Sequence, residues 1–212
     1  MTALPPLSPL SDCYGYDRGT PADRPYIDAF LASRQAAVHG HGAEVKDSTY
    51  LTRYGTQRLT SITVIDIDPG NADATLRADL AAPGSLPAAA FDVIILTQVL
   101  QLLADPAAAL DNCARALRTG GTLLLTVPCL GRISPSGAGC DRWRWTPAGL
   151  AALLAAWPGP AEITAHGNAA TCVAAILGAA REDLPDGTDL SDDPRFPLIA
   201  CAAAAKAAQP AR

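Results

Sequence analysis

The sequence predicts a single α/β domain: a Rossmann-like, mostly parallel seven-stranded sheet with helices on both faces and an N-terminal helical lid. Apolar runs of strand length alternate with helical patterns along the chain, which is typical of α/β proteins. Residues 91–128 contain a strand pattern, a helical pattern and a second strand pattern, as a right-handed parallel crossover does. The runs 93–96 and 122–127 lack polar alternation, which indicates strands covered on both faces.

The crossover also contains signals for the ends of its helix. Asp105 is a suitable N-cap and Pro106 fits the first helical position. The pair Gly120-Gly121 is expected to end the helix before the second strand begins. Because ligands of parallel sheets lie beyond the carboxyl ends of the strands, Thr97, Gln98, Pro128 and Cys129 are expected to face a site.

The remaining elements complete the alternating pattern. Further strands are expected at residues 43–46, 63–67, 74–78, 161–165 and 197–204, and further helices at 24–37, 147–156 and 169–180. Asp23 and Thr146 are candidate N-caps of the first two of these helices. The segment before residue 24 concentrates aromatic and charged side chains, so it is expected to be a lid over a ligand, a cover for the sheet edge, or both.

Length and composition indicate one domain of ordinary size. The chain has 212 residues, of which 49% are hydrophobic and 17% charged, which suits a real core and argues against disorder. Residues 1–12 are rich in Pro, Ser and Leu and are expected to be disordered. The domain is expected to span residues 13–206, and residues 207–212 are expected to fray.

Charge and cysteine usage argue against several classes of function. The net charge of −5 gives no reason to expect nucleic acid as a partner. No apolar stretch reaches membrane-spanning length and the N-terminus lacks the pattern of a signal peptide, so a cytoplasmic protein without a membrane partner is expected. The six cysteines and three histidines form no Cys-x-x-Cys pair and no Cys/His cluster, which argues against a zinc site.

Carboxylates recur where the predicted strands end. Glu44 lies in the first strand, Asp66 and Asp68 end the second, and Asp79 follows the third. A carboxylate at the end of the second strand is placed to accept both hydroxyls of an adenosine ribose, and Asp79 could accept an adenine amino group. Acidic residues are also common in such turns simply as caps, so spacing alone leaves both interpretations open.

Six blocks of sequence together carry a resemblance to a known family. They are DRGTPADRPYIDAFL, AEVKDSTY followed by TRYG, VIDIDPGNADATLRADL, FDVIILTQVLQLL, LRTGGTLLLTVP and DRWRWTPAGL. In this order they resemble the class I S-adenosylmethionine-dependent methyltransferases. More narrowly, they resemble the small methyltransferase-like proteins of bacterial polysaccharide and natural-product gene clusters. The resemblance covers roughly residues 14–206 and says little about the substrate.

The resemblance implies S-adenosyl-L-methionine as cofactor and implies which residues bind it. Asp68 falls on the family's ribose-binding acid, Asp79 on its adenine-side acid, and Gln98 near the methyl-bearing sulfur. The full implied set is Glu44, Val45, Lys46, Asp47, Asp68, Pro69, Asp79, Leu80, Thr97 and Gln98.

One residue of the first-strand motif departs from the family. Lys46 stands where the family has glycine, and KDSTYLTRYG replaces the usual glycine-rich loop. Glycine serves at such a position because it tolerates positive φ, whereas a residue with a Cβ costs about 1–2 kcal/mol there. Two outcomes follow: the ammonium group of Lys46 turns toward the methionine carboxylate, or the side chain fills the pocket and prevents the usual binding of the cofactor.

The block DRWRWT follows the fifth strand, and two interpretations of it are open. It could be a substrate wall, in which Trp143 faces a ring and Arg144 binds an anion. Alternatively Trp143 pins the loop against the sheet and Arg144 pairs with Asp141. The candidate substrate-binding residues are Tyr16, Arg18, Tyr26, Gln101, Trp143 and Arg144. The candidate catalytic residues are Asp141 as general base, Gln98 and Tyr26.

The function expected from these features is methyl transfer from S-adenosylmethionine to a small molecule. The acceptor atom is expected to be a hydroxyl oxygen, or less readily carbon or nitrogen, of a sugar or natural-product scaffold in a biosynthetic pathway. Two alternatives remain because of Lys46: a non-methylating enzyme such as a cyclase or isomerase on the same fold, and a non-catalytic partner of a biosynthetic enzyme. A homodimer is compatible with the sequence.

Overall fold

The computed structural model describes residues 8–133 and 139–208. Seven strands form one sheet: β1 (Gly40–Val45), β2 (Leu59–Asp66), β3 (Leu76–Arg77), β4 (Phe91–Thr97), β5 (Leu117–Pro128), β6 (Ala161–His166) and β7 (Ile199–Ala205). Their order is β3-β2-β1-β4-β5-β7-β6, with β1 to β5 parallel and β7 antiparallel to both of its neighbours. The predicted mostly parallel seven-stranded sheet is therefore confirmed.

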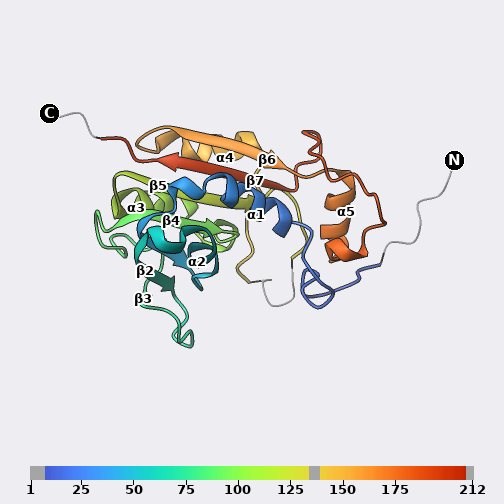
Figure 1. Cartoon of the computed structure of the whole chain (residues 1–212), viewed down its shortest axis with the longest axis horizontal. Coiled ribbons are helices and arrows are strands. Elements are labelled where there is room, and N and C mark those ends of the chain that lie inside the picture. The colour runs from blue at the N-terminus through green and yellow to red at the C-terminus, as the bar shows by residue number, and fades with distance from the viewer. Residues whose placement is uncertain (1–7, 134–138, 209–212) are drawn as a thin grey trace.

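Helices cover both faces of the sheet, as predicted (Figure 1). The α-helices are α1 (Arg24–Ser33), α2 (Thr49–Gly55), α3 (Pro106–Ala116), α4 (Pro147–Leu153) and α5 (Ala169–Leu177). Short 3-10 helices lie at Gln35–Ala37, Thr56–Arg58, Leu100–Leu102, Leu154–Ala156 and Arg181–Asp183.

The alternating side chains of β4 show how the core divides between the two faces. Ile94 and Leu96 pack in one hydrophobic cluster with buried residues of α3 and α4. Val93 and Ile95 pack in the other cluster, with buried residues of α1, α2 and α5. All four side chains are fully buried, which explains why the sequence of this strand lacks polar alternation.

The start of α3 follows the predicted chemistry, but its end does not. The Asp105 side chain accepts the N–H of Ala108 at 2.9 Å, and Pro106 occupies the first turn. The helix ends at Ala116, so the prediction that Gly120-Gly121 ends it is wrong. Leu117 is already extended and pairs with Phe91, and Gly120 has a φ of +81° within β5. The glycine pair instead lies where the register between β4 and β5 shifts, and its backbone exchanges hydrogen bonds with Lys206.

Of the two N-caps predicted for α1 and α4, only the one at α4 forms. Thr146 Oγ1 accepts the Gly149 N–H at 3.1 Å and caps α4 as expected. Asp23 makes no side-chain capping hydrogen bond to α1, so that prediction is wrong: with φ −83° and ψ −25° its backbone is already helical. Helix α2 was not predicted, and it forms within the segment KDSTYLTRYG that follows β1.

The N-terminal segment runs past α5 before it enters α1. Leu10 N–H donates to Leu177 O, and Pro21 forms an isolated bridge with Ala180. Residues 1–7 and 209–212, which fall in the stretches predicted to be disordered or frayed, lie outside the described residues. Across residues 8–133 and 139–208, none of the helices has the length and apolar character needed to cross a membrane.

Candidate functional site

Two adjoining cavities lie at the carboxyl ends of the parallel strands. The outer cavity has a volume of about 1170 Å³ and is bordered by the ends of β1, β2 and β4 and by α2. The inner cavity, of about 290 Å³, is bordered by the N-terminal segment, the residues after β5 and the start of β7. Six residues line both cavities and mark the junction between them: Tyr16, Pro21, Arg24, Lys46, Gln98 and Leu102. This is the edge of the sheet where the sequence placed the site.

Three carboxylates from neighbouring strand ends line the outer cavity: Asp66, Asp68 and Asp79. Asp68 is exposed and accepts the Gly70 N–H at 2.8 Å. Asp79 accepts the Ala81 N–H at 2.9 Å. Each of these two hydrogen bonds engages one carboxylate oxygen, so the predicted ribose-side and adenine-side acids are brought to one cavity with acceptor capacity left for a ligand.

Asp66 is a third carboxylate of this cavity that the predicted set left out. It is the last residue of β2, and it accepts the Asp68 N–H at 3.0 Å and Asn71 Nδ2–H at 2.7 Å. Partial burial acts to raise the pKa of Asp66, but these hydrogen bonds and the charge of Lys46 hold it below the usual range. Its place at the carboxyl end of the strand is the signal that could have identified it.

Glu44 is turned toward α2. The side chain is 2% exposed, and it accepts the N–H of Tyr50 at 3.1 Å and that of Leu51 at 2.8 Å. Burial raises the pKa of Glu44 to about 7, against the effect of the two amides. Glu44 therefore satisfies the first turn of α2, and it borders the outer cavity as it does so.

Lys46 has the backbone conformation that glycine would tolerate. Its φ is +78°, and the conformation is held by Lys46 N–H donating to Ile65 O at 2.9 Å and Asn71 Nδ2–H donating to Lys46 O at 2.7 Å. The residue is exposed and borders both cavities. Lys46 lines the outer cavity of about 1170 Å³ together with Val45 and Asp47.

Thr97 and Gln98 lie at the end of β4, where both line the outer cavity and Gln98 also lines the inner cavity. Gln98 has a φ of +55°, a conformation costly for a residue with a Cβ. Gln101 is 9% exposed, lines the inner cavity, and donates Nε2–H to Gln98 O at 2.8 Å. The Gln101 Oε1 atom is buried without a hydrogen-bond partner.

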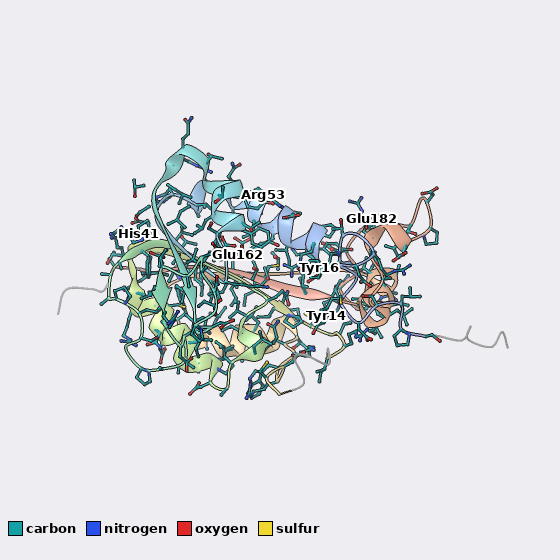
Figure 2. All side chains as sticks on the ribbon, turned by 90° about the horizontal axis from the view of Figure 1, so that it is seen from below. Tyr14, Tyr16, His41, Arg53, Glu162 and Glu182 are labelled. Atoms are coloured by element: carbon teal, nitrogen blue, oxygen red, sulfur yellow. The ribbon has the colours of Figure 1, made fainter. Side chains whose placement is uncertain are left out.

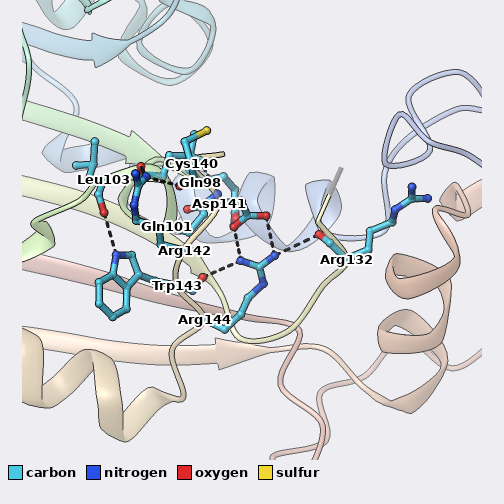
Figure 3. A network of polar contacts seen from close by, with 10 residues as sticks. Gln98, Gln101, Leu103, Arg132, Cys140, Asp141, Arg142, Trp143 and Arg144 are labelled. Carbon is cyan, nitrogen blue, oxygen red and sulfur yellow. Dashed lines mark hydrogen bonds and ion pairs between the residues drawn. The ribbon is translucent and has the colours of Figure 1, made fainter. Parts of the chain in front are cut away.

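The DRWRWT block makes the contacts expected of a pinned loop (Figure 3). Arg144 donates two hydrogen bonds to Asp141, at 2.5 and 2.8 Å, and the Asp141 side chain is 5% exposed. Trp143 Nε1–H donates to Leu103 O at 2.8 Å, and its ring stacks on the buried Trp145 at 6.2 Å. Asp141 and Arg144 border the inner cavity, whereas Trp143 borders neither cavity.

Tyr26 and Arg18 lie away from both cavities. Tyr26 borders a separate cavity of about 190 Å³, and its hydroxyl donates to Leu190 O at 3.1 Å. Arg18 forms two hydrogen bonds of 2.7 Å with Asp183. Both side chains hold the N-terminal segment against residues 181–190.

Two residues that sequence analysis did not place in the site, Asp23 and Arg24, border the inner cavity. Arg24 also borders the outer cavity, donates Nη1–H to Tyr50 Oη at 3.1 Å, and lies 5.5 Å above the Tyr16 ring. Tyr14 and Tyr16 precede it on the same segment (Figure 2), and both border the inner cavity. The segment predicted as a lid therefore borders the inner cavity through Tyr14, Tyr16 and Asp23.

Metal chemistry finds no support among the described residues. No group of three or more His, Cys, Asp or Glu side chains in residues 8–133 and 139–208 could hold a metal ion. The arrangement instead consists of a carboxylate-rich cavity, suited to a ligand with several hydroxyl or amino groups, joined to a smaller mixed cavity.

Comparison with known proteins agrees with this geometry. Residues 40–125 match the family model described as "Methyltransferase domain". No curated protein matches the chain.

Solved structures with the same architecture cover nearly the whole chain. An S-adenosylmethionine-dependent methyltransferase from Mesorhizobium loti is 16% identical, covers 91% of this chain and 100% of its own, and has a TM-score of 0.59. The N-methyltransferase NodS from Bradyrhizobium japonicum WM9, in complex with S-adenosyl-L-homocysteine, is 16% identical and has a TM-score of 0.56. Its alignment covers 91% of this chain and 90% of the NodS chain. The [4+2]-cyclase SpnF is 18% identical and also has a TM-score of 0.56, and its alignment covers 91% of this chain and 84% of the SpnF chain. At these identities the likeness shows the fold, and the chain has the Rossmann-like fold of these proteins.

Proposed function

We propose that this protein is an S-adenosylmethionine-dependent methyltransferase that acts on a hydroxyl group of a small molecule. The observation that carries the proposal is the outer cavity, where Asp68 and Asp79 from neighbouring strand ends face the same space as the end of β4. The match of residues 40–125 to a methyltransferase domain supports it. The expected acceptor is a sugar or a natural-product scaffold.

The residues of the outer cavity suit the parts of the cofactor. Asp68, with Asp66 beside it, would accept the ribose hydroxyls, and Asp79 would accept the adenine amino group, with the buried Leu80 next to it. The amino-acid part of the cofactor would then lie toward the junction. Lys46 supplies a positive charge there for its carboxylate, in place of the amides of a glycine-rich loop.

The chemistry required of the protein is mainly alignment. The cofactor, when bound, supplies a methyl group on a positively charged sulfur. The chain must hold an acceptor oxygen in line with that group and keep water out of the junction. The volume of the inner cavity, about 290 Å³, is at the lower end of the range for small-molecule pockets, so a small acceptor or one ring of a larger one fits best.

Lys46 was the reason to consider a non-methylating enzyme or a non-catalytic partner. Because its side chain leaves an open cavity and its backbone keeps the positive φ of glycine, the chain retains room for the cofactor. This observation supports methyl transfer over the two alternatives.

The test is transfer of a labelled methyl group. Methyl-tritiated S-adenosylmethionine is incubated with the protein and with the small-molecule fraction of an extract from the source organism, and label in new products is counted after chromatography. The proposal predicts a labelled product that Asp68→Ala reduces at least tenfold through a higher KM for the cofactor. The matched control Asp73→Ala alters an exposed carboxylate of the same turn that does not border the cavities. Absence of any labelled product would contradict the proposal.

A further inference from the structure

Two carboxylates border the inner cavity, Asp23 and Asp141, and no histidine does. Every Asp, Glu and His of the sequence lies within the described residues, so these two are the ordinary candidates for a general base at this cavity. A hydroxyl acceptor must lose its proton as its oxygen bonds to the methyl carbon. Which of the two carboxylates can take that proton is therefore a question that the structure can answer.

Asp141 is already engaged. Two N–H groups of Arg144 hold its two oxygens at 2.5 and 2.8 Å, and its side chain is 5% exposed. Both oxygens of Asp141 are therefore occupied by hydrogen bonds from Arg144 and face a guanidinium group instead of an acceptor hydroxyl. Arg144 also donates to Trp143 O and Arg132 O, so the pair holds the loop in place.

Asp23 is far less constrained. Its side chain is 23% exposed, and its nearest cationic atom is Arg24 Nε, at 3.9 Å from Oδ1. It gives α1 no capping hydrogen bond. Burial raises the pKa of Asp23, against the effect of the Arg24 charge, and a raised pKa suits a group that must take up a proton near neutral pH.

Asp23 also lies close to the junction of the two cavities. Its charge acts on both Tyr16 and Tyr50, which line the junction and the outer cavity. Arg24, its neighbour in sequence and its ion-pair partner, lines both cavities. Asp23 and Gln98 thus both line the inner cavity, and Gln98 also lines the outer cavity.

Some buried polar atoms of residues around the inner cavity have no hydrogen-bond partner. Among the described residues, five buried side-chain nitrogen or oxygen atoms lack a hydrogen-bond partner. Three of them, Arg24 Nε, Gln101 Oε1 and Arg144 Nε, belong to residues that border this cavity.

We propose that Asp23 accepts the proton of the acceptor hydroxyl. In the step, the O–H bond breaks and the proton passes to Asp23. The oxygen lone pair bonds to the methyl carbon, and the electron pair of the carbon–sulfur bond goes to sulfur, which leaves as a neutral thioether. This assignment depends on the methyl transfer proposed above.

The groups around Asp23 predict how the rate depends on pH. Arg24 faces it from α1, Tyr16 from the preceding segment and Tyr50 from α2. Across the inner cavity lie Lys46, Arg132 and the Asp141–Arg144 pair. Protonation of Asp23 removes the base, so the rate should fall on the acid side of the profile.

The experiment compares Asp23→Asn with Asp141→Asn in the labelled-methyl assay, from pH 5.5 to 9, at a temperature where circular dichroism shows each variant folded. Binding of S-adenosylhomocysteine is measured for each by calorimetry. Asp23→Asn should lower kcat at least 100-fold, flatten the acid limb, and leave the affinity within twofold of wild type. Asp141→Asn should retain the acid limb of the pH profile, whatever kcat it reaches, since the role of Asp141 is to hold the loop through Arg144.

Each other outcome overturns the assignment. A rate within threefold of wild type for Asp23→Asn, or a loss of cofactor affinity instead of kcat, would show that Asp23 is not the base. If the wild-type protein binds S-adenosylhomocysteine but transfers no methyl group, the proposed function itself fails and the role of Asp23 falls with it. If Asp23→Asn does not fold, ¹³C NMR of labelled aspartate in the wild-type protein decides instead: a carboxyl pKa at or below about 3.9 would overturn the assignment.

Discussion

The buried carboxylate of Glu44 should make the stability of this protein depend on pH in a way that a single substitution removes. Glu44 lies under the first turn of α2, at the edge of the outer cavity, with 2% of its surface exposed. Burial raises its pKa from 4.5 to about 7. The change to test is Glu44→Gln, which keeps the shape and can still accept a hydrogen bond from Tyr50 or Leu51.

The sign and size of the effect follow from proton linkage. Between pH 4.5 and 7 the folded protein keeps a proton on Glu44 that the unfolded chain has lost. The stabilisation by this proton is fully present below pH 4.5 and disappears as pH rises to about 7. Each unit of pKa difference corresponds to about 1.4 kcal/mol, so the full change is about 3 kcal/mol.

The assay is urea unfolding of wild type and Glu44→Gln at intervals from pH 4.5 to 8. The wild-type free energy of unfolding minus that of the variant should fall by about 3 kcal/mol up to pH 7 and then stay level. Glu162→Gln is the control, because its side chain is 59% exposed and lies on the far edge strand β6. A difference that stays constant across this range would refute the account of Glu44.

Three further substitutions test single features of the site. Lys46→Gly should raise the free energy of unfolding by about 1 kcal/mol in urea unfolding, because glycine adopts a φ of +78° without strain; lower stability would show that the lysine side chain contributes more than its backbone costs. Asp141→Asn should lower the free energy of unfolding by about 2 kcal/mol, because Arg144 loses its carboxylate partner. An unchanged melting curve would contradict a stabilising role of the Asp141–Arg144 pair. Trp143→Phe should lower the free energy of unfolding by about 1 kcal/mol through loss of the hydrogen bond to Leu103. Calorimetry should find the cofactor affinity of this variant unchanged, and weaker cofactor binding would place the indole in the site.

Most of the fold could be predicted because its signals are local. The unbroken apolar run of β4 requires cover on both faces, and Asp105 and Thr146 cap helices through atoms only a few residues away. The end of α3 was missed because a long-range event decides it. Pairing of Leu117 with Phe91 draws the chain into the sheet three residues before the glycine pair.

Helix α2 was missed because its stability depends on a buried partner. Its first turn is satisfied by Glu44, which comes from the preceding strand and was assigned to the cofactor instead. The sequence segment itself has no N-cap hydrogen bond and little apolar periodicity.

The site could be located to one edge of the sheet, but side-chain directions could not be predicted. Residues at strand ends, such as Asp68 and Gln98, reach the cavities because parallel strands all end at one edge. On α1 and the segment before it, the side chains of Tyr26 and Arg18 point away from the two cavities, whereas Arg24 borders them. Helix phase and tertiary ion pairs decide these directions, and neither is visible in a list of residue types.

The most direct test of the proposed function is a calorimetric titration of the wild-type protein with S-adenosylhomocysteine. Binding with a Kd of the order of 1–100 μM is expected, in the range of ordinary substrate constants. Asp79→Ala should weaken it at least tenfold, whereas Asp73→Ala should leave it unchanged. The absence of heat at millimolar ligand would contradict the account, because a cavity of this size and acidity would then serve another ligand.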